Sequence, residues 1–286
     1  MQNLHSNIEK VLIIGATGKT GRRVCQLLSE LLPSDKIKAA SRNAEIHFDW
    51  QDNKTWSKAL DQTSHVYLTY SPDLAVPSAI QHISTFCNLA KKKNIKHITI
   101  LSGRGEPAAQ ACEDILINSG INWTIIRASW FNQNFSDGFF NSFIHNGLIC
   151  LPVNAVKEPF IDIDDIAEIV CQSFIDPKHS NKLYEVTGPE LLTFSDIATL
   201  FSEVLNKEVK FEKLTQATFE SEMSVAQVPE DIISLLNFLF TEVLDGRNEY
   251  ITNGVEQALG RKPNRPTAFI KPHPATPQAR PRPLPP

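Results

Sequence analysis

The chain has 286 residues and a formal net charge of −4, which is enough length for one large α/β unit with a small lobe. The negative charge argues against nucleic acid as a main partner, because binding phosphates needs a concentrated basic surface. No apolar run approaches the roughly 18 residues of a membrane span and the N-terminus has no secretory apolar core, so we expect a cytoplasmic protein without a membrane partner.

The stretch VLIIGATGKTG at residues 11–21 contains two competing nucleotide-binding patterns. The letters GKT match the end of a P-loop, but that motif needs a glycine five residues earlier, where Ile13 stands. The alternative is an apolar strand that runs into a dinucleotide-binding turn. There Gly15 makes the turn, Gly18 lets the backbone approach a pyrophosphate, and Gly21 lets the next helix pack on the strand. An ordinary βα turn without a ligand remains the plain alternative, because the spacing departs from G-x-G-x-x-G.

Apolar, β-rich segments alternate with helical patterns through the first half of the chain. The predicted strands lie at 10–15, 37–41, 65–70, 97–103 and 122–129, and the predicted helices at 19–32, 76–93 and 107–119. This alternation predicts an α/β fold, with a Rossmann-type doubly wound parallel sheet over residues 1–150 that binds NAD(P). The interval after Ser41 is too short for a helical crossover, so any strand at 46–48 follows an abbreviated connection.

After residue 150 the predicted elements become shorter. A turn leads into a helix that ends near residue 175, a strand follows at 182–188, and Thr193 caps the next helix. Residues 209–214 and helices near 215–222 and 229–244 complete the pattern. We expect a small α/β substrate lobe over 151–272, above the carboxyl ends of the strands, where such sheets bind ligands.

The proline-rich residues 273–286 are predicted to be a disordered tail, with a polyproline docking peptide as the alternative. The five cysteines lie far apart among apolar neighbours and are interpreted as reduced structural thiols. No histidine pairs with a cysteine or glutamate at a ligand spacing, so no metal is expected.

The residues after the second strand indicate the cofactor. NAD-selective folds place an acidic residue there, whereas a basic residue accommodates the 2′-phosphate of NADP. This chain has Ser41 and Arg42 and no carboxylate, which favours NADP(H), with Arg42 bidentate on the phosphate. The alternative is a solvated loop arginine. Nearby, Asp49 either accepts a hydrogen bond from the adenine amino group or caps the helix that begins near Asn53.

A reductase of a ketone usually needs a general acid beside the hydride donor. Short-chain reductases commonly supply it as Tyr-x-x-x-Lys, but none of the four tyrosines has a lysine four places on. The catalytic residues are therefore unknown at this stage. Either the chain binds a dinucleotide without doing chemistry, or its substrate needs little acid help.

Several motifs occur together in the order of a known family. They are GATGKTGRRV, SRN, FDW, LSG, IRASWFNQNF, PFIDIDDIAEIV and YEVTGPELLTFSDIA, over roughly residues 9–270. Together they resemble the NmrA-like branch of atypical short-chain dehydrogenase/reductases. The last two motifs, with VPEDI at 228–232, are similar to the festuclavine/agroclavine dehydrogenase subgroup of ergot-alkaloid enzymes.

The resemblance implies roles for the residues that match the family motifs. The residues implied at the pyrophosphate are Gly15, Thr17, Gly18, Lys19, Thr20 and Gly21, with Arg42 at the 2′-phosphate. Those implied beside the nicotinamide and its ribose are Tyr70, Ser71, Ser102 and Gly103. Trp130, Phe131 and Asn134 resemble the substrate-pocket loop, although the two aromatic residues are as well explained by packing. Isoflavone-reductase-like relatives carry a catalytic lysine where this chain has Ala109, so that chemistry is not available.

These observations favour an NADP(H)-dependent oxidoreductase that transfers a hydride to a small organic substrate of the iminium, quinone or enone type. An iminium carbon accepts hydride without a protonation step, which fits the missing Tyr-Lys dyad. The alternative is a non-catalytic, NmrA-like redox sensor that binds NAD(P) and a protein partner; a homodimer is compatible with either function. An isomerase or dehydratase with tightly held NAD is disfavoured, because Arg42 favours NADP and no acid/base pair is visible.

Overall fold

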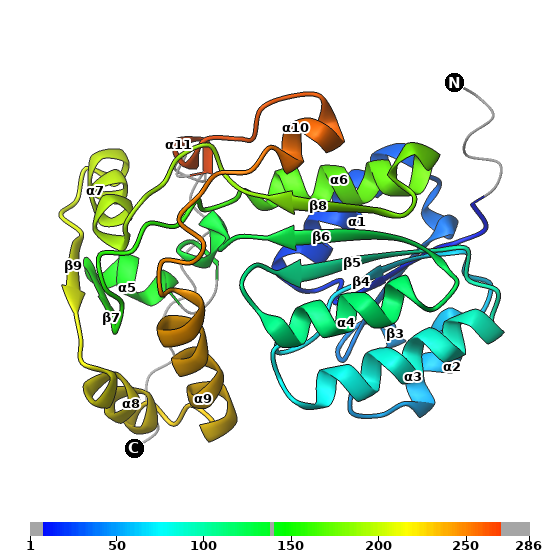
Figure 1. Cartoon of the computed structure of the whole chain (residues 1–286), viewed down its shortest axis with the longest axis horizontal. Coiled ribbons are helices and arrows are strands. Elements are labelled where there is room, and N and C mark those ends of the chain that lie inside the picture. The colour runs from blue at the N-terminus through cyan, green and yellow to red at the C-terminus, as the bar shows by residue number, and fades with distance from the viewer. Residues whose placement is uncertain (1–7, 138–139, 270–286) are drawn as a thin grey trace, which may run out of the picture.

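A seven-stranded sheet organises the larger part of the chain (Figure 1). The computed structural model describes residues 8–137 and 140–269, so the tail expected at 273–286 lies outside the described residues. Neighbouring strands are parallel throughout, in the order β3-β2-β1-β4-β5-β6-β8. The strands are β1 (Val11–Ile14), β2 (Ile37–Ser41), β3 (Ile46–His47), β4 (His65–Leu68), β5 (His97–Gly103), β6 (Asn122–Ala128) and β8 (Lys182–Val186). The predicted doubly wound parallel sheet is confirmed, with the strand order reversing between β1 and β4.

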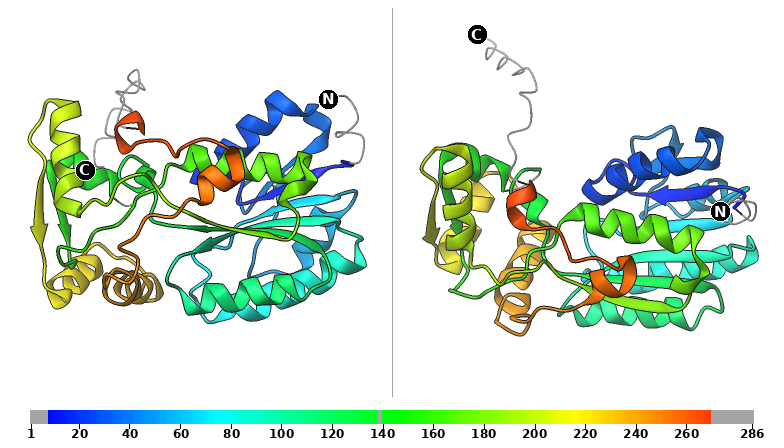
Figure 2. Two further views of the ribbon diagram at one scale, coloured as in Figure 1. Left: turned by 45° about the horizontal axis from the view of Figure 1, so that its top comes forward. Right: turned by 90° about the horizontal axis from the view of Figure 1, so that it is seen from above.

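Helices cover both faces of this sheet, and Figure 2 shows the sheet between the two helical layers. On one face α1 (Lys19–Leu31) packs against α6 (Ile163–Ile175), and α10 (Gly254–Leu259) contacts α6 and β8. The helices of the other face are α2 (Lys54–Leu60), α3 (Ser78–Lys92) and α4 (Pro107–Ile117). Strands buried on both faces consist of continuous apolar runs, which explains the sequence VLII in β1.

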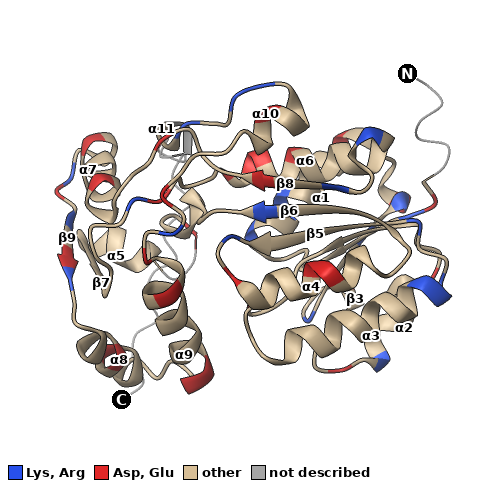
Figure 3. Cartoon of the chain, viewed as in Figure 1, with Lys and Arg blue, Asp and Glu red and all other residues tan. Residues whose placement is uncertain are grey.

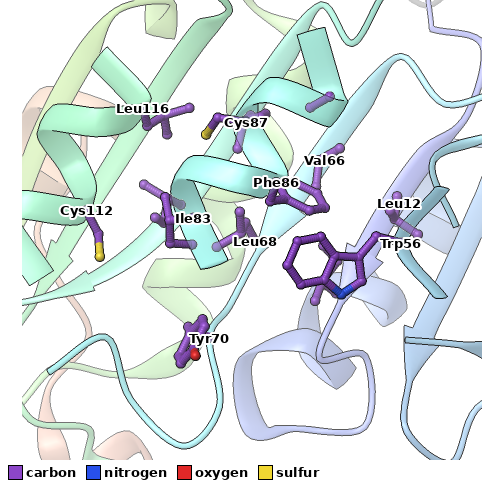
Figure 4. Close-up of a cluster of buried hydrophobic side chains, with 14 of the residues drawn as sticks. Leu12, Trp56, Val66, Leu68, Tyr70, Ile83, Phe86, Cys87, Cys112 and Leu116 are labelled. Atoms are coloured by element: carbon purple, nitrogen blue, oxygen red, sulfur yellow. The ribbon is translucent and has the colours of Figure 1, made fainter. Parts of the chain in front are cut away.

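The core under α2, α3 and α4 fixes the strands that lead to the site (Figure 4). Leu68 of β4 and the α3 residues Ile83 and Phe86 are fully buried in it. Burying one such side chain stabilises the fold by about 1.5–3 kcal/mol. Tyr70 belongs to the same cluster but follows the end of β4, so the core also holds the first residues of the next loop in place.

The abbreviated connection expected after Ser41 is present. Only residues 42–45 separate β2 from β3, yet the two strands pair in parallel, with Ala40 opposite Ile46. The N–H of Phe48 donates to the carbonyl of Ser41 over 3.1 Å, which closes the turn. Arg42 therefore stands at the tip of a tight loop at the carboxyl end of the sheet.

A smaller lobe lies beyond the carboxyl ends of β5, β6 and β8, at the left of Figure 1. Its own two-stranded parallel sheet joins β7 (Leu148–Leu151) to β9 (Lys210–Lys213). Its helices are α5 (Asn141–Asn146), α7 (Phe194–Leu205), α8 (Gln216–Val225) and α9 (Glu230–Phe238), with a π-helical turn at Leu239–Val243. Thr193 caps α7 as predicted, in a reciprocal pair with Asp196.

The large sheet continues past residue 150, where the sequence analysis placed the start of the lobe. β8 pairs with β6 from Lys182 to Val186, and α6 packs on α1, so both belong to the sheet layer. The lobe is therefore interrupted by the α6–β8 unit and does not run continuously over 151–272. Short helix and strand patterns look alike in either unit, and only the pairing of β8 with β6 separates them. The remaining short elements are 3-10 turns at Ser34–Lys36, Asn132–Asn134 and Pro177–His179 and a helix α11 (Pro266–Phe269).

None of the helices in the described part of the chain is long and apolar enough to cross a bilayer.

Candidate functional site

The glycines after β1 form a tight turn in front of α1. Gly15 has a φ of +79°, which favours glycine, and its N–H donates to the carbonyl of Ala40 over 2.9 Å. The N–H of Gly18 donates back to the carbonyl of Gly15, also over 2.9 Å. A Cβ on Gly21 would stand 2.1 Å from the Gly15 carbonyl oxygen. The turn is therefore closed by backbone contacts that a side chain at Gly15 or Gly21 would disrupt.

The amino end of α1 is an open anion site. Its N-cap is Gly18, so no side chain caps the helix, and the N–H groups of the first turn have no intrahelical partner. The helix dipole adds positive potential at this end. Lys19 lies in the first turn, where burial lowers the pKa of its ammonium group. The turn therefore offers uncapped backbone donors, the arrangement with which helix amino ends bind phosphates.

A cavity of about 1060 Å³ extends from this turn across the carboxyl ends of the strands to the lobe. It brings together the predicted cofactor and substrate residues, except Gly21, which packs behind the turn. Those lining it are Gly15, Thr17, Gly18, Lys19, Thr20, Ser41, Arg42, Asp49, Tyr70, Ser71, Ser102, Gly103, Trp130, Phe131 and Asn134. Residues from six separate segments of the chain thus border one space.

The Arg42 end of the cavity is polar and open. The Arg42 side chain is exposed, and within the described ranges its guanidinium forms no ion pair. The Ser41 hydroxyl lies at the buried root of this loop and accepts from the N–H of Asn43 over 3.3 Å. Arg42 is therefore free to pair with an anion from outside the chain.

Asp49 lines the cavity and does not cap α2. Its carboxylate accepts from the N–H of Gln51 over 3.0 Å, whereas the N-cap of α2 is Asn53, which makes no capping hydrogen bond with its side chain. Its carbonyl accepts from the indole N–H of Trp56 over 2.7 Å. Of the two roles weighed for this side chain, the cap is absent and the position beside the cavity is retained.

Aromatic rings form the wall between the two ends of the cavity. Trp50 and Tyr70 lie with ring centroids 4.9 Å apart, and the indole N–H of Trp50 donates to the carbonyl of Thr69 over 3.0 Å. The Tyr70 hydroxyl lies 2.7 Å from His82 Nδ1 and 3.2 Å from the Ser78 hydroxyl, both on α3. Burial raises the pKa of Tyr70. This phenol is therefore engaged by α3 and has no lysine to activate it.

Buried ion pairs fix the strand ends at the centre of the cavity. The Ser102 hydroxyl donates to Glu113 Oε1 over 2.6 Å, and Arg127 holds both oxygens of the same carboxylate. Arg104, only 2% exposed, donates to Glu185 over 3.0 Å. Each of these two arginines is thus paired with a carboxylate, and of the two only Arg104 also borders the cavity.

Four carboxyl groups that the sequence analysis did not assign to the site also border the cavity, Asp73, Glu106, Glu158 and Asp231. Burial and then the charge of Asp73 raise the pKa of Glu106 to about 9, and burial also raises the pKa of Asp73. Burial raises the pKa of Glu158 to about 7. The only signal in the sequence was position, since Asp73 and Glu106 each follow a predicted strand within five residues. Acidic residues in loops are common, so that signal did not separate them from solvated side chains.

The lobe closes the far side of the cavity. Trp130 lines it and also stacks on Phe240 with centroids 5.6 Å apart, so its pocket and packing roles coexist. Pro229, Asp231 and Ile232 of the VPEDI segment add a wall from the start of α9. Figure 3 shows this acidic first turn in red, at the end of α9 that follows α8. An aromatic and acidic surface thus faces the ends of the parallel strands.

In the described ranges no group of three or more histidine, cysteine, aspartate or glutamate side chains is arranged to hold a metal ion. All five cysteines are described and unpaired. Burial raises the pKa of the Cys87 and Cys171 thiols to about 12, so both stay protonated and unreactive near neutral pH.

Comparisons with known proteins agree with this architecture. The model of the NmrA-like family matches residues 110–265. An agroclavine dehydrogenase of Claviceps fusiformis is 28% identical over 91% of this chain and 96% of its own length. Prestalk A differentiation protein A of Dictyostelium discoideum is 26% identical over 94% of both chains. The structure of an NADPH-dependent quinone oxidoreductase of Escherichia coli, complexed with NADPH, superposes with a TM-score of 0.76 at 20% identity, covering 91% of this chain and 98% of that chain.

Proposed function

Because the chain belongs to the NmrA-like family, as its motifs predicted, we propose that it is an NADP(H)-dependent oxidoreductase that reduces a small organic molecule. The observation that carries the proposal is the single cavity that joins the glycine turn and Arg42 to the aromatic wall of the lobe. A dinucleotide that spans this distance places its pyrophosphate on α1 and its ring near the end of β5.

The residues present fit NADP(H) at each part of the molecule. The open amino end of α1 binds the pyrophosphate, and Arg42, unpaired within the described ranges, binds the 2′-phosphate. Asp49 and Trp50 border the adenine end, and Ser71 borders the ribose of the nicotinamide. When bound, the reduced nicotinamide supplies a hydride.

The chain's own contribution to binding the acceptor is orientation. Trp130, Phe131 and the first turn of α9 line the same cavity as the end of β5, with aromatic, apolar and acidic side chains. A flat acceptor held there lies between the strand ends and the lobe, and fixed geometry of this kind accounts for much of enzymatic rate enhancement. Acceptors of the iminium, quinone and enone classes fit this description.

The extension of the cavity into the lobe supports the enzyme over a non-catalytic sensor. A sensor needs only the dinucleotide half of the space, whereas here Trp130, Asn134 and Ile232 line a region beyond the glycine turn. The relatives named above as a dehydrogenase and a quinone oxidoreductase point the same way.

The direct test is turnover of purified protein with NADPH and a panel of acceptors. Binding of NADPH should quench or shift its fluorescence, and absorbance at the reduced-nicotinamide band should fall only when an iminium, quinone or enone is added. Gly21→Ala serves as the matched control, because its Cβ would collide with the Gly15 carbonyl and remove the phosphate site. Binding of NADPH without oxidation by any acceptor class would refute the enzyme and leave the sensor.

A further inference from the structure

Two carboxyl groups from separate loops meet at the end of β5, inside the cavity. Asp73 lies between β4 and α3, and Glu106 lies between β5 and α4. Both line the cavity, and each side chain acts on the pKa of the other. On the basis of the proposed function, we propose that Asp73 and Glu106 share one proton and that Glu106 delivers it to an acceptor that has received a hydride.

The position of the pair follows from the sheet. β4 and β5 are parallel neighbours, with Leu68 opposite Ile100, so the loops that follow them leave the same edge. The Glu106 carboxylate lies directly over Gly103, the last residue of β5, where a Cβ would stand 2.0 Å from Glu106 Oε1. Gly103 thus makes room for the acid at the strand end that the sequence assigned to the nicotinamide.

The pair has no cation to neutralise it. In the described ranges neither Asp73 nor Glu106 takes part in an ion pair, because Arg104 is held by Glu185 and Arg127 by Glu113. Two neighbouring carboxyl groups that are mostly buried and interact without a cation resist being ionised together. One proton is therefore retained at neutral pH.

The groups around the pair affect which of the two carboxyl groups carries the proton. Glu106 is 7% exposed, and the negative charge of Glu113, on α4, adds to that of Asp73 in holding the proton. The other charged side chains that line the cavity are Lys19, Arg42, Asp49, Arg104, Glu158 and Asp231. One carboxylate oxygen of Asp73 is held by the N–H of Ala75 over 2.8 Å, which stabilises Asp73 as the ionised member. Glu106 is then the member that carries the proton.

The proton balances the reduction of a neutral acceptor. Hydride addition to a quinone or enone leaves an oxyanion. The O–H bond of Glu106 then breaks and a new O–H bond forms on the oxyanion. The neutral product dissociates, and the oxidised dinucleotide stays in the site. Glu106 precedes Pro107, the first residue of α4, so the carboxylate that forms lies at the positive end of that helix. Solvent then returns one proton to the pair. A cationic acceptor becomes neutral on hydride addition and needs none of this.

This difference defines the experiment. The probes are 1,4-naphthoquinone, which needs a proton, and crystal violet, a stable triphenylmethyl cation, which does not. In Glu106→Gln, kcat/KM for the quinone should fall about 100-fold or more, the usual contribution of a general acid, while the rate with the cation stays within about threefold and the Kd for NADPH is unchanged. The solvent deuterium isotope effect on quinone reduction should also disappear in this variant.

Asp73→Asn gives the second readout. Removing the neighbouring negative charge should let Glu106 lose its proton more easily, so the alkaline limb of the quinone pH profile should move to lower pH. A merely structural role for Asp73 would lower the rate without moving that limb. Asp114→Asn is the matched control, because Asp114 is an exposed carboxylate on the same helix as Glu113. It should change the reduction rate of neither acceptor.

The outcomes separate the two proposals. If Glu106→Gln lowers kcat/KM equally for both acceptors, or for neither, the proton delivery is refuted and the oxidoreductase proposal is unaffected. Failure of the wild-type protein to reduce either acceptor would overturn the oxidoreductase and the proton delivery together. If Glu106→Gln does not fold, the test is the alkaline limb of the quinone pH profile in Asp73→Asn. A shift of this limb to lower pH supports the shared proton, and an unchanged limb refutes it.

Discussion

Replacement of Arg42 by alanine tests how the chain distinguishes NADPH from NADH. The side chain is exposed at the tip of the 42–45 loop and, in the described part of the chain, has no carboxylate partner to lose. Among the described residues, the recorded hydrogen bond of Arg42 joins its carbonyl to His47 Nδ1 at 2.9 Å, and alanine keeps that carbonyl. The free energy of unfolding should therefore change by less than about 0.5 kcal/mol.

The effect on binding follows from the bonds that the guanidinium offers. Charge-assisted hydrogen bonds contribute about 1.5–3 kcal/mol, so the Kd for NADPH should rise about 10- to 150-fold. NADH has no 2′-phosphate, so its Kd should change little. Arg42→Lys keeps the charge without the planar pair of donors and should fall between alanine and wild type.

The assay is titration calorimetry with NADPH, NADH and 2′,5′-ADP, which carries the phosphate without the nicotinamide. Lys92→Ala removes an exposed positive charge from the last turn of α3, outside the cavity lining, and controls for net charge. Equal weakening of NADPH and NADH, or an unchanged Kd for 2′,5′-ADP, would refute the assignment of the 2′-phosphate to Arg42.

Three further predictions concern the turn, the lobe and pH. Gly21→Ala should destabilise the fold by about 1–3 kcal/mol and abolish NADPH binding, because its Cβ would stand 2.1 Å from backbone; denaturant unfolding and calorimetry check this, and wild-type binding by the variant would contradict it. Thr193→Ala should cost about 0.5–2 kcal/mol by removing the α7 capping box, whereas the exposed Ser195→Ala should be neutral in the same unfolding assay. Burial lowers the pKa of His97 to about 3, so the folded state stays neutral where the unfolded chain binds a proton below about pH 6.5. The contribution of His97 to the free energy of unfolding is therefore fully present above about pH 6.5 and is lost as the pH falls. The loss from this residue is about 2 kcal/mol at pH 5. Thr124→Val, which removes the hydroxyl 3.0 Å from His97 Nε2, should lower stability without flattening that slope, whereas His97→Gln should flatten it.

The strands and helices of the first half of the chain could be predicted from local sequence patterns. The run VLII is apolar at every position because β1 is covered on both faces, and the glycines at 15 and 21 are required by a left-handed φ and a close backbone contact. Such requirements act within a few residues, so they are visible in the sequence. The capping box at Thr193 is local in the same sense, and its prediction is confirmed.

The pairing of segments that are far apart in the chain could not be predicted from the sequence. β8 reads as a short strand after a helix, and its place beside β6 depends on contacts between residues almost 60 positions apart, such as Thr124 and Lys182. The lining of the cavity by Glu158 and Asp231 depends in the same way on how the lobe folds back over the sheet. Hydrophobic periodicity fixes which face of an element is buried, but it does not name the partner.

The Asp73–Glu106 pair changes what the missing Tyr-Lys dyad means. From the sequence alone, the absence of a general acid left a choice between a protein that does no chemistry and a substrate that needs no proton. Under the proposed proton delivery, a carboxylic acid at the end of β5 supplies the proton without a tyrosine, so that choice no longer arises. Two loops after neighbouring parallel strands must open onto the same edge, so acids 33 positions apart in the chain become one group in the cavity. Under the proposed proton delivery, the absence of the dyad does not restrict the chain to cationic acceptors.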